Sequence, residues 1–515
     1  MKAMEIFSSL LFIVFSFIIF YLYYLVWLKP EGIRRKMRQQ GINGPIPSSF
    51  FSGNIEDMKK FMQEKKKSPR GTVSHDYSIC PHLDHWRKNY GQVYVYTMGN
   101  APIMHVSSPE MVKEISQCLS IDFGKTTFLK ETLKPLFGDG IIKANGEIWS
   151  HQRKIIAPEF FLNKIKGMVD LMVDSTGPLL RLWENRIEEG EVEMELYEDL
   201  RNYSADVISR ACFGSSYLRG KEMFSKLRLL QNSLSKPNLF AEITGFRLLV
   251  PSKSGREVVK LEREVHSLIL ELVKDGQASG EEKNLLQAIL NGAKGSSFTS
   301  QDKADAFIVD NCKSIYFAGH ETTATAASWC LLLLALYPEW QHLVRSEITQ
   351  LCGGLSPDAQ SLQKMKILTM VIQETIRLYP PGPIISRESL QDMKLGKLDI
   401  PKGLGIYIPL PTLHRDPSIW GPDALIFNPK RFANGVTSAC TFPQAYAPFG
   451  AGARTCLGQH FAMLELKIVL SLILSKFCFS VSQNYCHSPY FKLLLEPEFG
   501  MHLTVKKGGF HKGWR

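Results

Sequence analysis

The sequence lacks the close cysteine spacings that build zinc sites and disulfide frameworks. Ten cysteines are spread over 515 residues, and no two of them form a Cys-x-x-Cys pair. This scatter excludes a zinc ribbon or finger and is typical of a chain in a reducing compartment. A Gly-x-Gly-x-x-Gly motif after a strand is also missing. The chain therefore does not bind a dinucleotide through such a loop.

Acidic residues are fewer than basic ones. The 61 lysines and arginines exceed the 50 acidic residues, so the formal net charge is +11 and the pI is near 9.0. A basic chain can bind nucleic acid, anionic lipid or an acidic protein. No nucleic-acid-binding motif accompanies the charge, so we expect no nucleic-acid partner and favour lipid or an acidic partner protein. An ordinary solvated surface is the alternative.

Charge is absent altogether from Ile6 to Leu28, where tyrosines and a tryptophan gather near the end of an apolar run. About 20 such residues span a bilayer. A secretory signal has a shorter apolar core and a small-residue cleavage site, and the sequence shows neither. We predict a transmembrane anchor over residues 1–28, with a buried core helix as the alternative. The basic residues after Leu28 place the following domain in the cytosol, beyond a basic, Pro/Gly-rich elbow at 29–47.

One cysteine stands in a glycine-rich turn directly before a helix. The turn is Phe449–Gly458, and the good helix former 459–467 follows it. Glycines permit backbone conformations that a Cβ forbids and let a flat ligand come close. The helix dipole and Arg454 favour a thiolate, so we expect Cys456 to have a lowered pKa that suits a metal ligand. A buried structural cysteine is the alternative.

The longest helical pattern runs from about Ser300 to Leu336 and ends before Pro338. At about 1.5 Å per residue it measures roughly 50 Å, so it must cross the core. Its middle, Ala318–Thr323, contains a glycine and two threonines, which are poor helix formers. A threonine hydroxyl can bond back to the carbonyl four residues earlier. The stretch is either a packing kink or a place where oxygen fits and protons arrive.

Other parts of the chain give weaker signals. A hairpin is expected at 94–96 and 103–106, and mostly helix from 163 to 290, with an irregular stretch at 215–260 that contains prolines and glycines. Trp149 and Arg153 share one face of a predicted helix, as do Glu374 and Arg377. Taken alone, such spacings commonly belong to solvated surface pairs.

Together these stretches resemble the motifs of the cytochromes P450. Phe449–Gly458 matches Phe-x-x-Gly-x-Arg-x-Cys-x-Gly at every fixed position. The resemblance implies that Cys456 is the axial thiolate ligand of haem iron and that Phe449 and Arg454 bind the cofactor. The family's other haem-binding positions fall on three further residues, which would reach the propionates: Trp149, Arg153 and, less securely, Arg387.

The same resemblance assigns roles on the helices. Ala318–Thr323 matches (Ala/Gly)-Gly-x-(Asp/Glu)-Thr-Thr, which implies that Thr322 makes the hydrogen bond on the O₂ side and that Glu321 delivers protons. The Glu-x-x-Arg helix and the Pro-x-Arg-Phe segment imply a structural cluster that holds the cysteine loop and is not catalytic. Its members are Glu374, Arg377 and Arg431.

The implied fold is mainly α with a small β-rich region, wrapped around one haem b in a monooxygenase domain at 48–515. The resemblance covers roughly residues 41–510. It implies NADPH electrons from a separate cytochrome P450 reductase, and a single-pass protein of the endoplasmic reticulum membrane. A haem-thiolate isomerase or dehydratase is one alternative, disfavoured by Glu321 and Thr322. A non-catalytic haem protein is another.

Finer stretches are similar to a plant branch of the family that oxidises gibberellins and related diterpenoid acids, and in some members triterpenoids. They are Ser74–Tyr77, Ala157–Phe161 and Ser204–Tyr217. The expected substrate is an apolar polycyclic terpenoid, a gibberellin or related diterpenoid acid, that is hydroxylated or epoxidised. A pentacyclic triterpenoid is the alternative. Apolar stretches near the site motifs, such as 141–142 and 382–385, suit such a substrate.

Overall fold

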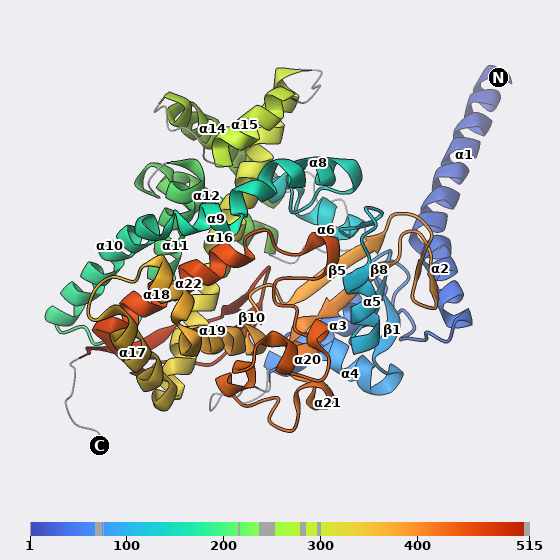
Figure 1. Cartoon of the computed structure of the whole chain (residues 1–515). Coiled ribbons are helices and arrows are strands. Elements are labelled where there is room, and N and C mark those ends of the chain that lie inside the picture. Colours follow the sequence, from blue (N-terminus) through green and yellow to red (C-terminus); the bar gives the residue numbers. More distant parts are fainter. Residues whose placement is uncertain are drawn as a thin grey trace.

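A computed structural model describes residues 2–66, 75, 77–214, 217–235, 253–278, 285–295 and 300–508. The predicted architecture, mainly α with a small β-rich region, is confirmed: helices form the bulk of the molecule and the sheets lie to one side of it (Figure 1). Two of the three stretches that suggested the plant branch are described only in part, because residues 74, 76, 215 and 216 lie outside these ranges.

The helices, in chain order, have the following bounds. They are α3 (Ile55–Lys66), α4 (Pro81–Tyr90), α5 (Pro109–Gln117), α6 (Thr127–Thr132), α7 (Lys134–Phe137), α8 (Gly146–Ile156), α9 (Leu162–Lys166), α10 (Val169–Glu188), α11 (Tyr197–Phe213), α12 (Tyr217–Ser235), α14 (Lys253–Ala278), α15 (Leu285–Gly295), α16 (Gln301–Leu336), α17 (Pro338–Cys352), α18 (Ala359–Lys364), α19 (Lys366–Leu378), α20 (Leu410–His414), α21 (Pro417–Trp420) and α22 (Gln459–Lys476). Helices α1 and α2 precede them.

The amino-terminal helix projects away from the rest of the molecule (Figure 1). It consists of α1 (Lys2–Tyr23), a π-helical turn (Tyr24–Leu28) and α2 (Lys29–Gln39), which follow one another without a break. Its apolar part is the one candidate membrane span in the described chain, and none of that window is buried. The helix contacts the domain at its end, where Tyr23 and Trp27 stack on Phe50. The exposed apolar window before them needs another apolar environment, which a bilayer supplies.

Helix α2 shows that the elbow begins later than the sequence suggested. Residues 29–39 are helical, and Ile33 and Met37 are buried where α2 packs on strands β1 and β2. Arg34 is also buried and donates from Nη2 to the carbonyl of Pro45 at 3.0 Å. Apolar residues four apart fix the helix on the domain because they share one face. Only the turn formers after Gln40 leave the helix.

The main sheet has five strands in the order β1-β2-β8-β5-β3. The predicted hairpin is confirmed: β1 (Val93–Met98) pairs antiparallel with β2 (Ala101–Val106), and Gly99 turns with φ 61°. β2 runs parallel to β8 (Gly405–Pro409), which lies antiparallel to β5 (Ile384–Ser389), and β5 pairs with β3 (Phe123–Gly124). Smaller sheets contain β4 (Glu193–Glu195), β6 (Met393–Leu395), β7 (Leu398–Ile400), β9 (Phe477–Val481), β10 (Pro489–Phe491), β11 (Leu495–Pro497) and β12 (His502–Lys507).

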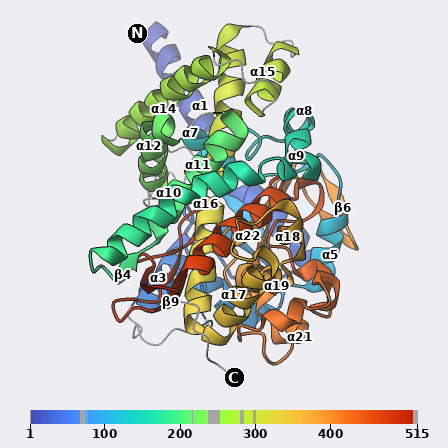
Figure 2. The ribbon, with the colours of Figure 1, turned by 60° about the vertical axis from the view of Figure 1, so that its left-hand side comes forward.

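Helix α16 is the axis of the molecule. It has 36 residues, ends before Pro338 as predicted, and runs from the α15 side to the α17 side (Figure 2). Its carboxyl-terminal half is buried on all sides, because α11, α19, α22 and β9 pack around it. A helix that is surrounded in this way needs no polar face, which explains its run of leucines and alanines.

The prediction of an irregular stretch at 215–260 is wrong where the structure describes it. Residues 217–235 form α12, and 253–260 belong to α14; residues 236–252 lie outside the described chain. The buried side chains Met223, Leu227 and Leu230 follow the spacing of one helix face. Their burial outweighs the cost of about 1 kcal/mol for Gly220 inside the helix.

Truncation tests whether the anchor provides membrane attachment while α2 stabilises the domain. A chain that starts at Lys29 is expected to lose tight membrane attachment and to keep most of its unfolding temperature, because the removed segment contacts the domain mainly through the stacking of Tyr23 and Trp27 on Phe50. A chain that starts at Gln40 also loses Ile33 and Met37, and large buried apolar side chains are worth about 2–5 kcal/mol each. Membrane sedimentation and thermal unfolding measure the two effects. Equal unfolding temperatures for both truncations would contradict the packing role of α2.

Candidate active site

The cysteine loop has the geometry that its glycines require. Gly450 and Gly452 have φ of 80° and 71°, a region that residues with a Cβ rarely adopt. A Cβ on Gly452 would also press against backbone carbonyls of 115–118 at 3.2–3.3 Å. The Cys456 N–H donates to the Phe449 carbonyl at 2.8 Å, and α22 begins three residues later. The predicted turn before a helix is therefore present.

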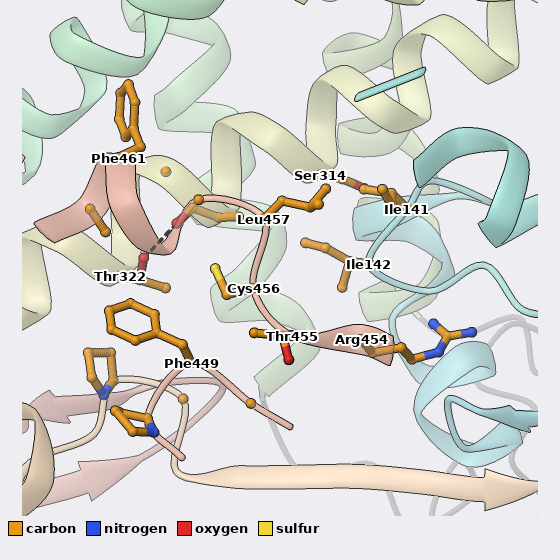
Figure 3. A pocket seen from close by; sticks show the side chains of 18 of the residues that line it. Ile141, Ile142, Ser314, Thr322, Phe449, Arg454, Thr455, Cys456, Leu457 and Phe461 are labelled. Carbon is orange, nitrogen blue, oxygen red and sulfur yellow. Dashed lines mark hydrogen bonds between the residues drawn. The ribbon is translucent and has the colours of Figure 1, made fainter. Parts of the chain in front are cut away.

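A cavity of about 360 Å³ lies between this loop and α16. Its walls come from α8, α11, α16, the 381–387 segment and α22, and they are mostly apolar. The Cys456 sulfur points into this space, with Phe449 beside it and Thr322 on the facing helix (Figure 3). The apolar lining residues include Ile141, Ile142, Ile208, Ile315, Ala318, Ile384 and Ile385.

The expected low pKa of the cysteine is wrong for the protein alone. Burial in the cavity wall raises the pKa of Cys456, and the Gly458 backbone N–H and Arg153 oppose this rise only in part. The helix dipole and one cation do not compensate for the loss of water around a thiolate. A bound metal ion would supply the missing positive charge, because coordination deprotonates a thiol.

The middle of α16 supplies the polar groups of the opposite wall. Thr322 donates its hydroxyl to the Ala318 carbonyl at 2.6 Å, the back-bond that its position in the helix predicts. A Cβ on Gly319 would lie 2.4 Å from Ile208 Cδ1, so this glycine lets α11 approach α16. The packing explanation of the stretch is therefore confirmed, and its role toward oxygen and protons stays a prediction.

Glu321 has a different surrounding from its neighbour. It is buried, forms an ion pair with the buried Arg201 of α11, and lies 3.6 Å from His320 Nδ1. It does not line the cavity in the described structure. Arg201 also bonds Glu198, which is half-exposed and pairs with Arg228. A chain of charged groups therefore joins the buried acid to the surface.

Four positive side chains line the cavity near the cysteine loop. Arg153 donates to the Thr455 carbonyl at 3.1 Å, and Arg387 donates to the Ala451 carbonyl at 3.1 Å. Arg454 bonds the Ala144 carbonyl at 2.9 Å, and Lys125 is the fourth cation. None of the four has a carboxylate among the charges that shift its pKa in the described chain.

The electrostatics of this cation cluster favour an anionic ligand. Burial and mutual repulsion lower the pKa of Arg454 to about 9, and burial lowers that of Arg387 to about 10, so both stay charged at neutral pH. The same causes lower the pKa of Lys125 to about 7. Trp149 packs against the cluster, with the Arg454 guanidinium 4.4 Å from its ring centroid. Buried cations without anionic partners are costly, so carboxylates of a bound ligand would stabilise this cluster.

The predicted structural cluster forms on α19. Arg377 is fully buried and donates from Nε and Nη2 to the two carboxylate oxygens of Glu374, at 2.6 and 2.8 Å. Its Nη1 donates to the His414 and Ala424 carbonyls. Arg431 Nε lies 3.7 Å from Glu374, which makes it the third member. None of these three charged residues lines the cavity described here, consistent with the absence of a catalytic role.

His414 connects this cluster to the cysteine loop and was not found from the sequence. Its Nε2 accepts from the Ala447 N–H at 3.2 Å, so Nδ1 carries the proton and donates to the Arg377 carbonyl at 3.1 Å. Burial lowers the pKa of His414 to about 3, which keeps the ring neutral and fixes this pattern. Tyr446 adds a bond to the Gln373 carbonyl at 3.0 Å.

Comparison with known proteins agrees with this geometry. A family model described as Cytochrome P450 matches residues 75–503. The chain belongs to the cytochrome P450 family. It is 51% identical over 509 residues to cytochrome P450 714B2 of rice, with 95% of this chain and 94% of the relative covered. It is 52% identical to cytochrome P450 714B3 of maize (95% and 93% covered) and 46% identical to cytochrome P450 714A2 of Arabidopsis thaliana (92% and 93% covered).

Membership makes this protein a haem-dependent monooxygenase, and its residues fit the cofactor. A haem carries two propionates, and the four cations that lack carboxylate partners are gathered on one side of the cavity that holds the Cys456 sulfur. The flat space beside a glycine-rich loop suits a planar ring. No cluster of three or more metal-binding side chains occurs in the part of the chain described, so one cysteine is the expected protein ligand.

Lys125 and Arg201 are functional candidates that the motifs did not reveal in this cytochrome P450. Each lies outside the recognised stretches and reaches its partner only through tertiary packing. Sequence spacing carried no signal for either role, because Glu321 is 120 positions from Arg201, and Arg387 and Arg454 are even farther along the chain from Lys125. A lysine of pKa about 7 in a row of arginines is visible only once the fold is known.

Lys125 generates a pH prediction for haem binding to the apoprotein. Its lowered pKa means that it is charged below about pH 7 and loses the charge above, so propionate binding must recapture a proton at higher pH. Ligation also releases the Cys456 proton, which favours haem binding at higher pH in every variant. The Lys125 contribution is therefore expected as a haem affinity of wild type that falls relative to that of Lys125→Met as pH rises through 7. Lys125→Met should remove this pH dependence and weaken binding at pH 6, whereas Lys125→Arg should bind tightly throughout. Haem titrations from pH 6 to 8 measure this; an unchanged pH profile in Lys125→Met contradicts it.

Proposed function

We propose that this cytochrome P450 inserts one oxygen atom from O₂ into a polycyclic isoprenoid, a gibberellin or related diterpenoid acid, by hydroxylation or epoxidation. In this proposal Cys456 is the axial ligand, and Trp149, Arg153, Arg387 and Arg454 hold the haem through its propionates. The observation that carries it is the placement of the Cys456 sulfur below an apolar cavity whose opposite wall presents Thr322. Bound in this way, a haem thiolate supplies O–O cleavage.

The substrate class rests on the walls of the cavity. Apart from the cation cluster, the polar lining side chains in the described structure are Ser314, Thr322, Thr323 and Thr455. Ser314 donates its hydroxyl to the Asp310 carbonyl, so it is already paired. Such a pocket obtains affinity from apolar contact and orientation from few polar groups. A rigid terpenoid skeleton matches such a pocket, and the sequence resemblance of Ala157–Phe161 to the terpenoid-oxidising plant branch supports the same class.

The chain's own residues have separable tasks in this reaction. Ile141, Ile142 and Ile384 exclude water and hold the substrate against α16. Thr322 keeps a hydroxyl at the helix wall, where its back-bond to Ala318 fixes the oxygen and leaves a lone pair free to accept. Glu321 is the residue proposed to deliver protons, and Arg201 holds its carboxylate in place without relaying protons itself. Its ion pair with Arg201 must open for that transfer, because the carboxylate does not line the cavity.

Electrons are expected from a separate NADPH-dependent cytochrome P450 reductase. The chain offers no dinucleotide loop of its own, and its positive net charge suits an acidic partner. The exposed apolar helix α1 is a candidate anchor, and the basic residues of α2 support a cytosolic orientation of the domain. An endoplasmic reticulum membrane would bring enzyme, reductase and a lipid-soluble substrate together.

Thr322→Ala is expected to uncouple NADPH oxidation from product formation. The variant removes the hydroxyl that faces the cysteine, and a positioned proton-transfer group typically contributes about 10²–10⁴-fold. Product per NADPH should fall and peroxide should rise, while Thr322→Ser should keep most of the coupling. Both variants should keep the long-wavelength band of the reduced CO complex, because the thiolate is untouched. A wild-type yield of product per NADPH in Thr322→Ala would contradict the proposed role of Thr322.

Substrate-induced spectral shifts test the proposed substrate. The reconstituted enzyme is titrated with diterpenoid acids, pentacyclic triterpenoids, fatty acids and small aromatics, and products are identified after turnover. Diterpenoid acids are expected to shift the haem spectrum and to be oxidised, and Cys456→Ser serves as the control that lacks the thiolate. A response to triterpenoids alone would refute the gibberellin part. Turnover of only fatty acids or aromatics would refute the polycyclic part as well.

A further inference from the structure

Two residues of the stretch Ser74–Tyr77 belong to a buried polar cluster that the proposed mechanism does not use. The structure describes His75 and Tyr77 of this stretch, and both are buried. Tyr77 donates its hydroxyl to the Leu378 carbonyl at 2.7 Å, and His75 Nδ1 lies 2.7 Å from the Tyr379 hydroxyl. Both hydrogen bonds therefore attach this early segment of the domain to the carboxyl end of α19.

Two aromatic rings stack on the side chain of Tyr379. Its ring centroid lies 4.4 Å from that of Trp329 on α16 and 5.2 Å from that of Tyr77, and the rings are nearly parallel in both pairs. The Tyr379 side chain is fully buried. Because interiors are closely packed, such a ring cannot change its rotamer without displacing the rings that it contacts. The position of Tyr379 is thus fixed by packing as well as by its hydroxyl.

The hydroxyl of Tyr379 is part of a continuous chain of hydrogen-bonding groups. Successive contacts in this chain measure 2.8, 3.3, 2.7 and 3.2 Å, and its members are Tyr485, His487, Tyr379, His75 and Tyr337. A neutral imidazole can donate through one nitrogen and accept through the other, so His75 can serve both of its phenol partners. Burial is the main cause that lowers the pKa of His75 to about 4, which keeps the ring neutral at pH 7.

Tyr379 directly precedes one wall of the active-site cavity. This substrate wall is the segment Pro381–Ile385, and four of its five residues line the cavity: Pro381, Gly382, Ile384 and Ile385. Two consecutive prolines separate Tyr379 from Gly382 and restrict the backbone between them. A change in the position of Tyr379 is therefore transmitted to the substrate wall with little freedom.

Trp329 attaches to the same wall by a second path. Its Nε1 donates to the Leu495 carbonyl at 2.9 Å, and the Leu495 N–H donates to the Pro381 carbonyl at 2.9 Å. The ring that stacks on Tyr379 thus also supports the start of the wall. The wall continues into β5, where Arg387 is proposed to bind the haem. A shift at Pro381 relative to Arg387 would change the distance between wall and haem.

We propose that His75 and Tyr77 are positioning residues that set which carbon of the substrate is oxidised. They act through the carboxyl end of α19, where Tyr379 fixes the substrate wall against which a rigid skeleton rests. A polycyclic isoprenoid offers many similar C–H bonds, and a misplacement of about 1 Å is enough to change reactivity strongly. The inference rests on the proposed monooxygenase function and names residues that give it regioselectivity.

The first test compares the ratio of products that are oxidised at different carbons, with the diterpenoid acid that gives the largest spectral shift. Tyr379→Phe and Tyr77→Phe keep the stacked rings and lose one hydroxyl each. Each is expected to change the ratio by about twofold to tenfold, the range for one buried hydrogen bond. Tyr337→Phe is the matched control, because it removes the other partner of His75; its ratio should equal that of wild type. An unchanged ratio in either test variant, or an equal change in Tyr337→Phe, would overturn the proposal.

Replacement of His75 separates its two hydrogen bonds. An asparagine amide lies near the position of Nδ1, whereas a glutamine amide reaches the position of Nε2. His75→Asn is therefore expected to keep the wild-type product ratio, and His75→Gln to shift it in the same direction as Tyr379→Phe. Equal ratios in the two variants would mean that the cluster only stabilises the fold, and would overturn the positioning role. If Tyr379→Phe loses the thiolate CO band, this pair of His75 variants decides.

The second test needs no turnover. Hydrogen–deuterium exchange of the holoprotein is followed by mass spectrometry in peptides that cover residues 381–389. Tyr379→Phe and Tyr77→Phe are expected to speed exchange in this segment and to leave α10 unchanged, because only the local attachment is weakened. Faster exchange throughout the domain, or unchanged exchange at 381–389, would overturn the local positioning role.

The two proposals fail separately. A wild-type protein that oxidises no diterpenoid or triterpenoid with NADPH and reductase would refute the proposed function, while faster exchange confined to 381–389 in the variants would still support the positioning of the wall. Normal oxidation with a product ratio that neither Tyr379→Phe nor Tyr77→Phe changes would leave the monooxygenase function standing and refute the positioning role.

Discussion

The fully buried ion pair between Glu374 and Arg377 is the constraint on which the active site depends. A lone buried charge is costly, and removal of one partner from such a pair typically destabilises a protein by about 3–5 kcal/mol. The guanidinium also donates to the backbone carbonyls of His414, Ala424 and Ile426. The pair therefore fixes three separate points of the segment that leads to the cysteine loop.

That segment carries the constraint to Cys456 through polar contacts. His414 bonds the Arg377 carbonyl on one side and the Ala447 N–H on the other, two residues before Phe449. Phe449 in turn accepts the Cys456 N–H. A sulfur that ligates a metal must be held in one position, because a displacement of about 1 Å would change the geometry at the reacting centre. The rigidity comes from saturated hydrogen bonds within the protein.

Helix α16 imposes the second constraint, which is the short distance between α11 and α16. Gly319 lets Ile208 of α11 come near enough that a methyl group would overlap with it. The approach brings Arg201 of α11 to Glu321, since positions 201 and 208 are two turns apart on one helix face. One glycine thus serves the packing of two helices and also places the cation that neutralises the buried acid.

How much of this was accessible from the sequence depends on the distance over which each interaction acts. The cysteine turn and the back-bond of Thr322 are local, so the residue pattern predicted them correctly. Spacing also predicted that Glu374 and Arg377 pair, but as a solvated pair; only the family resemblance implied the buried cluster. The predictions were wrong where tertiary packing determines the local structure. The apolar face of α12 overrode its glycine, and α2 continued as a helix because the sheet covers Ile33 and Met37.

The prediction of a lowered pKa for the Cys456 thiol was wrong for the same reason. The sequence shows a helix start and an arginine near Cys456, but it does not show how much water the cavity wall removes. Lys125 and Arg201 were missed because their partners come from distant parts of the chain. Their roles, like those of the haem-binding residues, remain proposals that rest on geometry and family membership.

The two buried acids Glu321 and Glu374 show how the origin of the arginine partner decides what an ion pair can do. Glu374 and Arg377 lie one turn apart on α19, and the carbonyls of His414, Ala424 and Ile426 accept the remaining guanidinium N–H groups. Opening this pair would leave several buried groups without partners, so it suits a structural role. Glu321 on α16 instead meets Arg201 on α11, and Arg201 also pairs with Glu198 near the surface. When that pair opens, the guanidinium keeps an anionic partner, and this suits the acid that is proposed to deliver protons beside Thr322.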